Sequence, residues 1–175
     1  MEVRSHTPAG SPLLAELLRV HDWLRRDLRQ CQEIARATRE GAAAVRVREQ
    51  VRELETSGPL WRLRANCLQY CALVHSHHRL EDDVLFPAMR RYAPELGKLV
   101  DRLERDHREV AALLDRVTTA AEALTGPRPD DVRARLAAAL DRLAEHLLEH
   151  LELEEKTLAP VLIKHQLRPE DLMRR

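Results

Sequence analysis

The sequence contains few aromatic residues and few glycines, which most small folds other than helical bundles require. Only 3% of its 175 residues are aromatic, and it has five glycines. These amounts disfavour a β-sandwich or barrel, whereas the abundance of Leu, Ala, Arg and Glu favours helices. No apolar run approaches the roughly 20 residues that span a bilayer. We therefore expect one all-α domain that does not enter a membrane.

Excess charge of one sign is also absent, since 29 Lys and Arg balance 29 Asp and Glu. A chain without net charge has no broad field that attracts nucleic acid, so no nucleic-acid partner is predicted. Three cysteines are an odd number, which argues against a disulfide framework. Residues 1–8 contain no apolar segment of the secretory type. Together these features predict a cytoplasmic location.

Apolar residues recur at helical spacing in four long segments that are separated by proline and glycine. The segments are residues 11–39, 59–91, 94–125 and 129–164. They predict an up-down-up-down four-helix bundle over residues 11–164. Residues 40–56 predict an extra short helix between the first and second segments. Residues 1–10 and 165–175 are expected to be short flexible tails.

A histidine interrupts the apolar stripe of each segment, and in two segments a glutamate follows four residues later. These residues are His21, His77 with Glu81, His107, and His150 with Glu154. Residues four apart share one face of a helix, so each pair presents an imidazole and a carboxylate to the same place. A buried, ionised glutamate is costly unless its charge is compensated. A metal ion compensates it, and a mixed nitrogen and oxygen shell suits iron, manganese or zinc.

Helix geometry places the four histidines at a common depth of the bundle. With a rise of about 1.5 Å per residue, their distances from the connecting turns match to within roughly one helical pitch. The motif His77-x3-Glu81-Asp82-x2-Leu85-Phe86-Pro87 also parallels His150-x3-Glu154-Glu155-x2-Leu158-Ala159-Pro160. The repetition predicts two half-sites related by a pseudo-twofold axis.

The ordered set of six residues resembles the hemerythrin-like family, also called the HHE cation-binding domain. The family pattern is one His on the first helix, His-x-x-x-Glu on the second, one His on the third and His-x-x-x-Glu on the fourth. The resemblance covers roughly residues 13–160 and implies a hemerythrin-type bundle around a non-haem di-iron centre. In that centre the two glutamates bridge two oxo- or hydroxo-bridged iron ions and the histidines are terminal ligands. Manganese or zinc could take the place of iron.

Two departures separate the sequence from the oxygen-carrying hemerythrins. Those proteins carry a second histidine four residues away on the third helix, where this chain has Leu103 and Ala111. They also end with His-x4-Asp on the fourth helix. The departures argue against reversible oxygen carriage and favour the broader HHE group. His146 lies one turn before His150, and we include it as a candidate fifth histidine ligand.

Several neighbouring residues have simpler interpretations. His75 and His78 lie about 160° and 100° around the helix from His77, so both are expected not to bind metal. Asp82 and Glu155 are expected to face solvent or to pair with arginines. An apolar collar is predicted to limit water at the site. It consists of Leu24, Val74, Val110 and Leu147.

The resemblance implies a protein that binds or senses dioxygen, peroxide or nitric oxide. No residue is predicted to be catalytic, and any enzymatic activity would be slow redox chemistry on peroxide or nitric oxide. One alternative is a ferritin-like iron store, although only Glu104-x-x-His107 fits the Glu-x-x-His pattern of that class. The other is a helical interaction module with a structural metal. The sequence indicates no particular protein partner.

Overall fold

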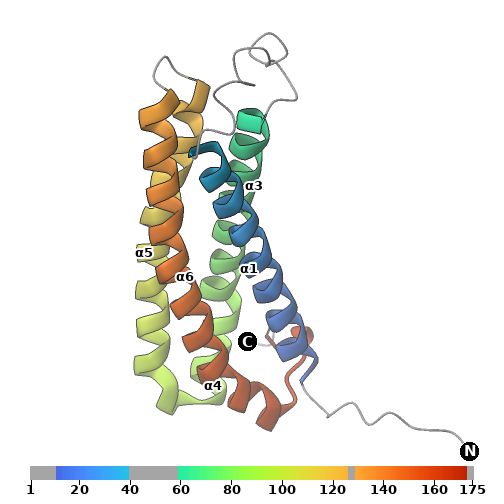
Figure 1. Ribbon diagram of the computed structural model, residues 1–175. Coiled ribbons are helices and arrows are strands. Elements are labelled where there is room, and N and C mark those ends of the chain that lie inside the picture. The colour runs from blue at the N-terminus through green and yellow to red at the C-terminus, as the bar shows by residue number, and fades with distance from the viewer. Residues whose placement is uncertain (1–10, 40–58, 126–128, 173–175) are drawn as a thin grey trace, which may run out of the picture.

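The structure is a computed structural model that describes residues 11–39, 59–125 and 129–172 (Figure 1). All regular elements within these ranges are helical, which confirms the all-α prediction. The elements are α1 (Pro12–Arg39), α3 (Pro59–Leu80), η2 (Glu81–Leu85), α4 (Phe86–Tyr92), η3 (Pro94–Leu96), α5 (Gly97–Glu122), η4 (Ala123–Thr125), α6 (Pro129–His165) and α7 (Pro169–Leu172). The four predicted helical segments correspond to α1, to α3 through α4, to η3 through η4, and to α6. The short helix predicted at residues 40–56 lies outside the described residues.

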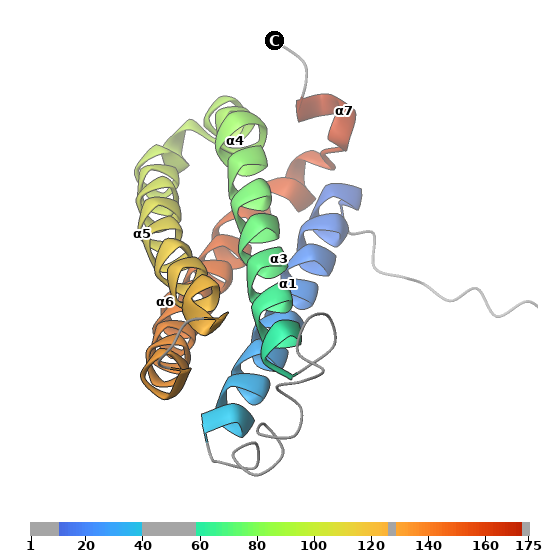
Figure 2. The same ribbon diagram turned by 90° about the horizontal axis from the view of Figure 1, so that it is seen from above.

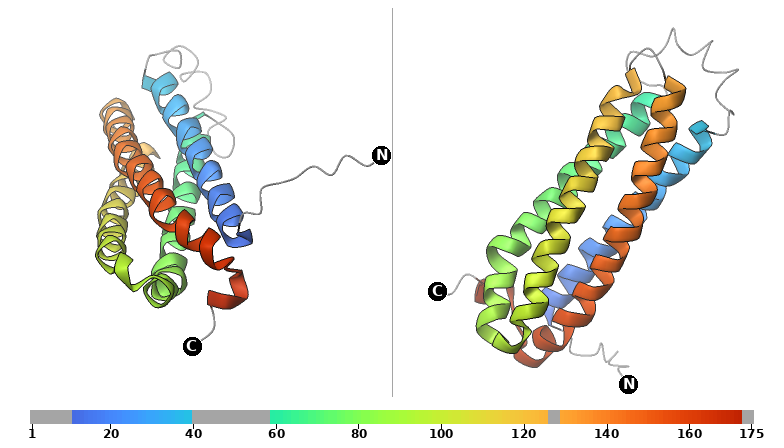
Figure 3. Two further views of the ribbon diagram at one scale, coloured as in Figure 1. Left: turned by 90° about the horizontal axis from the view of Figure 1, so that it is seen from below. Right: turned by 90° about the vertical axis from the view of Figure 1, so that its left-hand side faces the viewer.

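The four long helices form a bundle with alternating direction. Helices α1 and α5 run upward in Figure 1, and α3 and α6 run downward. Contacts join α1 to α3, α3 to α5, α5 to α6 and α6 to α1, so each helix packs against two antiparallel neighbours. Viewed from above, α1 and α5 lie on opposite sides of the bundle (Figure 2). The right-hand view of Figure 3 shows the long helices side by side. The predicted up-down-up-down bundle is confirmed.

The chain after α6 differs from the predicted flexible tail. Leu167 is only 2% exposed and belongs to the core at the lower end of the bundle. The hydroxyl of Ser11, the residue before α1, donates a hydrogen bond to the Leu167 carbonyl over 2.7 Å. Arg91 Nη2 donates to the Leu172 carbonyl over 3.2 Å at the end of α7. These contacts hold residues 165–172 against the bundle, so the polar composition of this segment was misleading.

Two apolar clusters fill the bundle, one above the other. The upper cluster is built on Leu24, Leu28, Cys31, Cys67, Tyr70, Cys71, Val74, Val110, Leu114, Leu140, Leu143 and Leu147. The lower cluster is built on Leu14, Leu17, Leu85, Phe86, Met89, Val100, Leu103, Leu158 and Leu162. Along α1, His21 lies between Leu17 of the lower cluster and Leu24 of the upper one. The other three long helical stretches also place histidines between the clusters, so a buried polar layer divides the core.

The second stretch contains a local departure from α-helical geometry. At η2 the Phe86 N–H bonds to the Glu81 carbonyl, five residues earlier, as in a π-helix. Pro87 follows directly, and a proline cannot donate the ordinary helical hydrogen bond. Pro160 has the matching offset in the repeated motif but lies within the continuous α-helix α6. The predicted pseudo-twofold relation therefore does not extend to the backbone.

None of the helices in the described ranges is long and apolar enough to cross a bilayer.

Candidate metal centre

The polar layer brings together all six residues of the predicted motif. Their potential ligand atoms fall into two groups, and within each group the atoms lie within 4.8 Å of one another. The first group is His21, His77, Glu81 and Glu154, and the second is His78, His107 and His150. The four helical stretches alternate in direction, yet their histidines meet at one depth, as the helix rise predicted. His78 belongs to the second group although it is not one of the six motif residues.

Both glutamates contact the two groups at once. Glu81 Oε1 lies 3.2 Å from His77 Nε2, and Glu81 Oε2 lies 3.6 Å from His107 Nε2. Glu154 Oε2 lies 3.5 Å from His21 Nε2 and 3.6 Å from His150 Nε2. A carboxylate between two sets of imidazoles is placed to share its oxygens between two cations. This arrangement fits a pair of metal ions better than a single one.

The donor atoms of this layer are buried, and many of them lack a hydrogen-bond partner, whereas Nε2 of His107 and Nε2 of His150 lie 3.0 Å apart and pair with each other. Glu81 is 2% exposed and Glu154 is fully buried. Within the described part of the chain, eight nitrogen and oxygen atoms of these residues have no hydrogen-bond partner. They are Nε2 of His21, His77 and His78, Nδ1 of His150, and both carboxylate oxygens of Glu81 and Glu154. Because an unpaired buried polar group costs about 1–3 kcal/mol, the layer is unfavourable without a cation. The donor set of imidazole and carboxylate suits iron, manganese or zinc.

Burial shifts the pKa values of both residue types toward their neutral forms. It raises the pKa of Glu81 well above its usual range, and the nearby charge of Glu154 adds to the shift. Burial also raises the pKa of Glu154 to about 8. The pKa values of His21, His77 and His150 are lowered to about 3, and that of His107 to about 2, mainly because burial disfavours imidazolium. Neutral imidazoles are the form that binds metal.

Two carboxylates outside the layer orient histidines inside it. Asp82 Oδ1 lies 2.7 Å from Nδ1 of His107, and Glu155 Oε1 lies 2.8 Å from Nδ1 of His21. Since Nε2 of each ring faces the glutamates, Nδ1 carries the proton and donates to the carboxylate. Arg25 Nη2 contacts the same Glu155 oxygen over 2.8 Å. The arginine partner of Glu155 was predicted, whereas the histidine partners were not, although both acids directly follow a motif glutamate.

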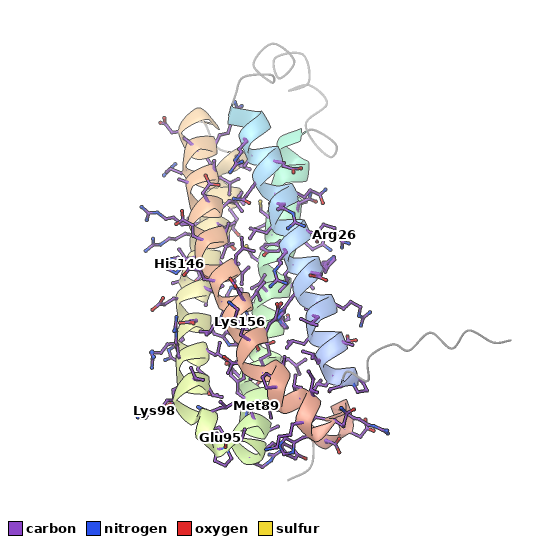
Figure 4. All side chains as sticks on the ribbon, turned by 60° about the horizontal axis from the view of Figure 1, so that its bottom comes forward. Arg26, Met89, Glu95, Lys98, His146 and Lys156 are labelled. Carbon is purple, nitrogen blue, oxygen red and sulfur yellow. The ribbon has the colours of Figure 1, made fainter. Side chains whose placement is uncertain are left out.

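His146 was predicted as a ligand, and the structure places it elsewhere. It belongs to neither donor group, its side chain is exposed, and Figure 4 shows it at the outer edge of the bundle. The phase difference of about 40° from His150 is enough to turn it out of the core. His146 instead lines a cavity of about 210 Å³ between α5 and α6. Asp106 and His150 also line this cavity, with Asp106 Oδ2 lying 3.9 Å from His150 Nδ1.

His78 was expected not to bind metal, but it is buried within the layer. Helix α3 contacts both α1 and α5, and consecutive residues of a helix point about 100° apart. His77 accordingly lies against His21 of α1, with ring centres 5.1 Å apart, while His78 lies against His107 of α5. The two adjacent histidines in the sequence indicated this arrangement, because a helix that packs against two neighbours can direct consecutive side chains toward each of them. The side chain of His75 is 41% exposed, and His75 belongs to neither donor group.

Residues 13–162 match the family model of the hemerythrin HHE cation-binding domain. The matched region contains every residue of both donor groups. The chain belongs to this family. Neither the comparison with curated proteins nor the comparison with solved structures gives a match. The family is a cation-binding one, and the structure contains two groups of side chains that could hold metal ions.

The metal-free HHE domain is expected to be most stable near pH 6.5. The histidines bind protons in the unfolded chain below about pH 6.5 but remain neutral in the folded protein, so stability falls as the pH drops toward about 3. The glutamates make stability depend on pH in the opposite direction, because the folded protein retains protons that the unfolded chain loses above about pH 4.5. Their contribution is lost as the pH rises toward about 8, the pKa of Glu154.

Urea denaturation of chelator-treated protein between pH 4 and 9 measures this dependence. The layer contains more histidines than glutamates, so below pH 6.5 the histidines dominate and the stability falls as the pH decreases. The metal-loaded protein is the matched control, since its ionised glutamates remove the decrease in stability above pH 6.5. A metal-free protein whose stability keeps rising through pH 8 would contradict the prediction.

Proposed function

We propose that this HHE protein is a cytoplasmic non-haem di-iron protein that binds or senses dioxygen, peroxide or nitric oxide. The observation that supports it most directly is the shared position of the two glutamates. Glu81 lies within 3.6 Å of imidazoles in both donor groups, and so does Glu154. Such a carboxylate pair would bridge two metal ions, and the groups on either side would each complete one ion's shell.

The surrounding residues suit a site that admits a small ligand and little water. The predicted collar residues Leu24, Val74, Val110 and Leu147 are all buried in the upper cluster. The lower cluster closes the layer from the opposite end. The cavity beside Asp106 and His146 reaches buried His150 from the surface. This geometry supports access for a ligand of two or three atoms along the α5–α6 side.

Iron would supply the redox chemistry that dioxygen, peroxide and nitric oxide require. The chain's contribution is to orient the donors and hold the imidazoles neutral. Asp82 and Glu155 fix the rings of His107 and His21 through Nδ1. Outer partners of this kind raise the basicity of metal-binding imidazoles and set their orientation. The three free cysteines support the cytoplasmic assignment.

A ferritin-like site receives less support from the geometry. The Glu-x-x-His pattern of that class would require Glu104 to act with His107. Glu104 instead pairs with Arg90 Nη2 over 2.9 Å outside the polar layer. The acids that enter the layer are those that follow a histidine by four residues, which is the HHE order.

Metal analysis combined with absorption spectroscopy tests the proposal. Protein produced with iron is expected to contain about two irons per chain and to show the spectrum of an oxo-bridged diferric centre. The anaerobically reduced protein should change its spectrum on exposure to air, peroxide or nitric oxide. Negligible iron content after loading, or a spectrum indifferent to all three ligands, would contradict the proposal.

A further inference from the structure

His78 is a buried imidazole that lies outside the family motif. It is 5% exposed, and its Nε2 has no hydrogen-bond partner among the described residues. An ordinary core histidine would satisfy this nitrogen with a backbone carbonyl or a hydroxyl, because an unpaired buried polar atom costs about 1–3 kcal/mol. The position of His78 therefore calls for a partner that the protein itself does not provide.

The rings around His78 show where that partner would lie. His78 stacks on His107 with ring centres 4.0 Å apart and planes inclined by 6°. It meets His150 edge to face, with ring centres 5.2 Å apart. One nitrogen of each of these three histidines lies within 4.8 Å of those of the other two, and Nε2 of His107 lies 3.0 Å from Nε2 of His150. The three imidazoles thus bring donor nitrogens together beside Glu81 and Glu154, and imidazole with carboxylate is a donor set that binds divalent metals.

The three residues come from three separate helices. Helix α5 offers only His107, because the residues one turn away are Leu103 and Ala111. Helix α6 offers His150, since His146 faces outward. His78 enters the same space from α3, next to His77, which serves the other group. One helix thus contributes an imidazole to each side of the glutamate pair.

We propose that His78 is a seventh metal ligand, which completes a three-imidazole position with His107 and His150. The inference rests on the proposed di-metal function and deepens it. The second position, held by His21 and His77, has two imidazoles, and Glu81 and Glu154 serve both. The two positions therefore differ in donor number, and removal of His78 weakens one of them while the other keeps its full set.

Titration with Co²⁺, followed by its ligand-field absorption and by metal analysis, tests the proposal. The wild-type chain is expected to bind two Co²⁺ ions. His78→Leu should retain one ion at wild-type affinity and bind the second at least about 10- to 100-fold more weakly, since even outer-shell changes have effects of that size. His78→Glu should restore the second ion with an altered spectrum, because an oxygen donor replaces nitrogen.

His75→Leu is the matched control, because His75 lies one turn earlier on α3, belongs to neither donor group and has its Nε2 3.8 Å from exposed Asp115. It should bind two ions as the wild type does. Circular dichroism of the metal-free variants checks the fold, and His78→Gln takes the place of His78→Leu if the latter does not fold. Two ions bound at unchanged affinity by the His78 variant would overturn the inference alone. A wild-type chain that binds no Co²⁺ would overturn the di-metal function as well.

Discussion

Iron(II) added without oxygen to the metal-free protein is expected to raise the midpoint of thermal unfolding by about 10–20 °C. A ligand at 100 times its dissociation constant stabilises the folded state by about 2.7 kcal/mol, so two sites contribute about 5 kcal/mol. In a chain of this size each kcal/mol shifts the midpoint by roughly 2–4 °C. The large effect has a structural cause, since the metal supplies partners to buried atoms that otherwise have none.

Differential scanning calorimetry with and without iron measures the shift. Mg²⁺ is a suitable control ion, because it prefers octahedral oxygen ligands and keeps several of its waters. A layer rich in imidazole should discriminate against it, and the midpoint should change by less than about 3 °C. Equal shifts with iron and magnesium, or no shift with either, would contradict a specific site in the polar layer.

The helices and the depth of the site were predictable because each depends on local regularities. The spacing of apolar residues and the positions of prolines predicted the four helical stretches, and α1 begins at Pro12, next to the predicted start at residue 11. A constant rise per residue then fixes which histidines share a level. These rules need no knowledge of which helix packs beside which. They are sufficient to bring His21, His77, His107 and His150 together.

The positions of His78 and His146 differ from those expected because they depend on how the helices are arranged around the core. Whether His78 or His146 lies in the layer depends on where the two helices packed against its own helix are located. The apolar stripe of one helix does not indicate these locations. α3 has neighbours on two sides, so two consecutive histidines both face inward. On α6 the turn from His150 to His146 leads into the solvent-exposed cavity instead. Helix phase alone favoured His146, about 40° from His150, over His78, about 100° from His77.

Long-range contacts account for the remaining differences. The chain after α6 looked like a tail because its residues are polar, but Leu167 finds a place in the lower cluster and Ser11 binds its carbonyl. Asp82 and Glu155 were assigned to the surface for the same reason. Their partners His107 and His21 lie 25 and 134 positions away along the chain. Sequence patterns within one helix carry no information on such pairs.

Replacement of Glu154 by leucine is expected to change metal binding and metal-free stability in opposite directions. Glu154 contacts imidazoles of both groups, so its loss removes a donor from both positions and metal content should fall from about two ions to below one. The metal-free variant should unfold with a free energy about 1–3 kcal/mol higher, because a buried carboxyl without partners is replaced by an apolar side chain. Metal analysis and urea denaturation measure the two effects.

Glu152→Leu provides the matched control on the same helix. Glu152 is exposed and pairs with Lys156, an interaction worth about 0.3–0.5 kcal/mol. Its replacement should leave the metal content unchanged and alter stability by no more than about that amount. If Glu154 were an ordinary structural residue, its loss would lower the metal-free stability. An increase in stability accompanied by loss of metal would instead mean that the buried carboxylate is retained for the ions it holds.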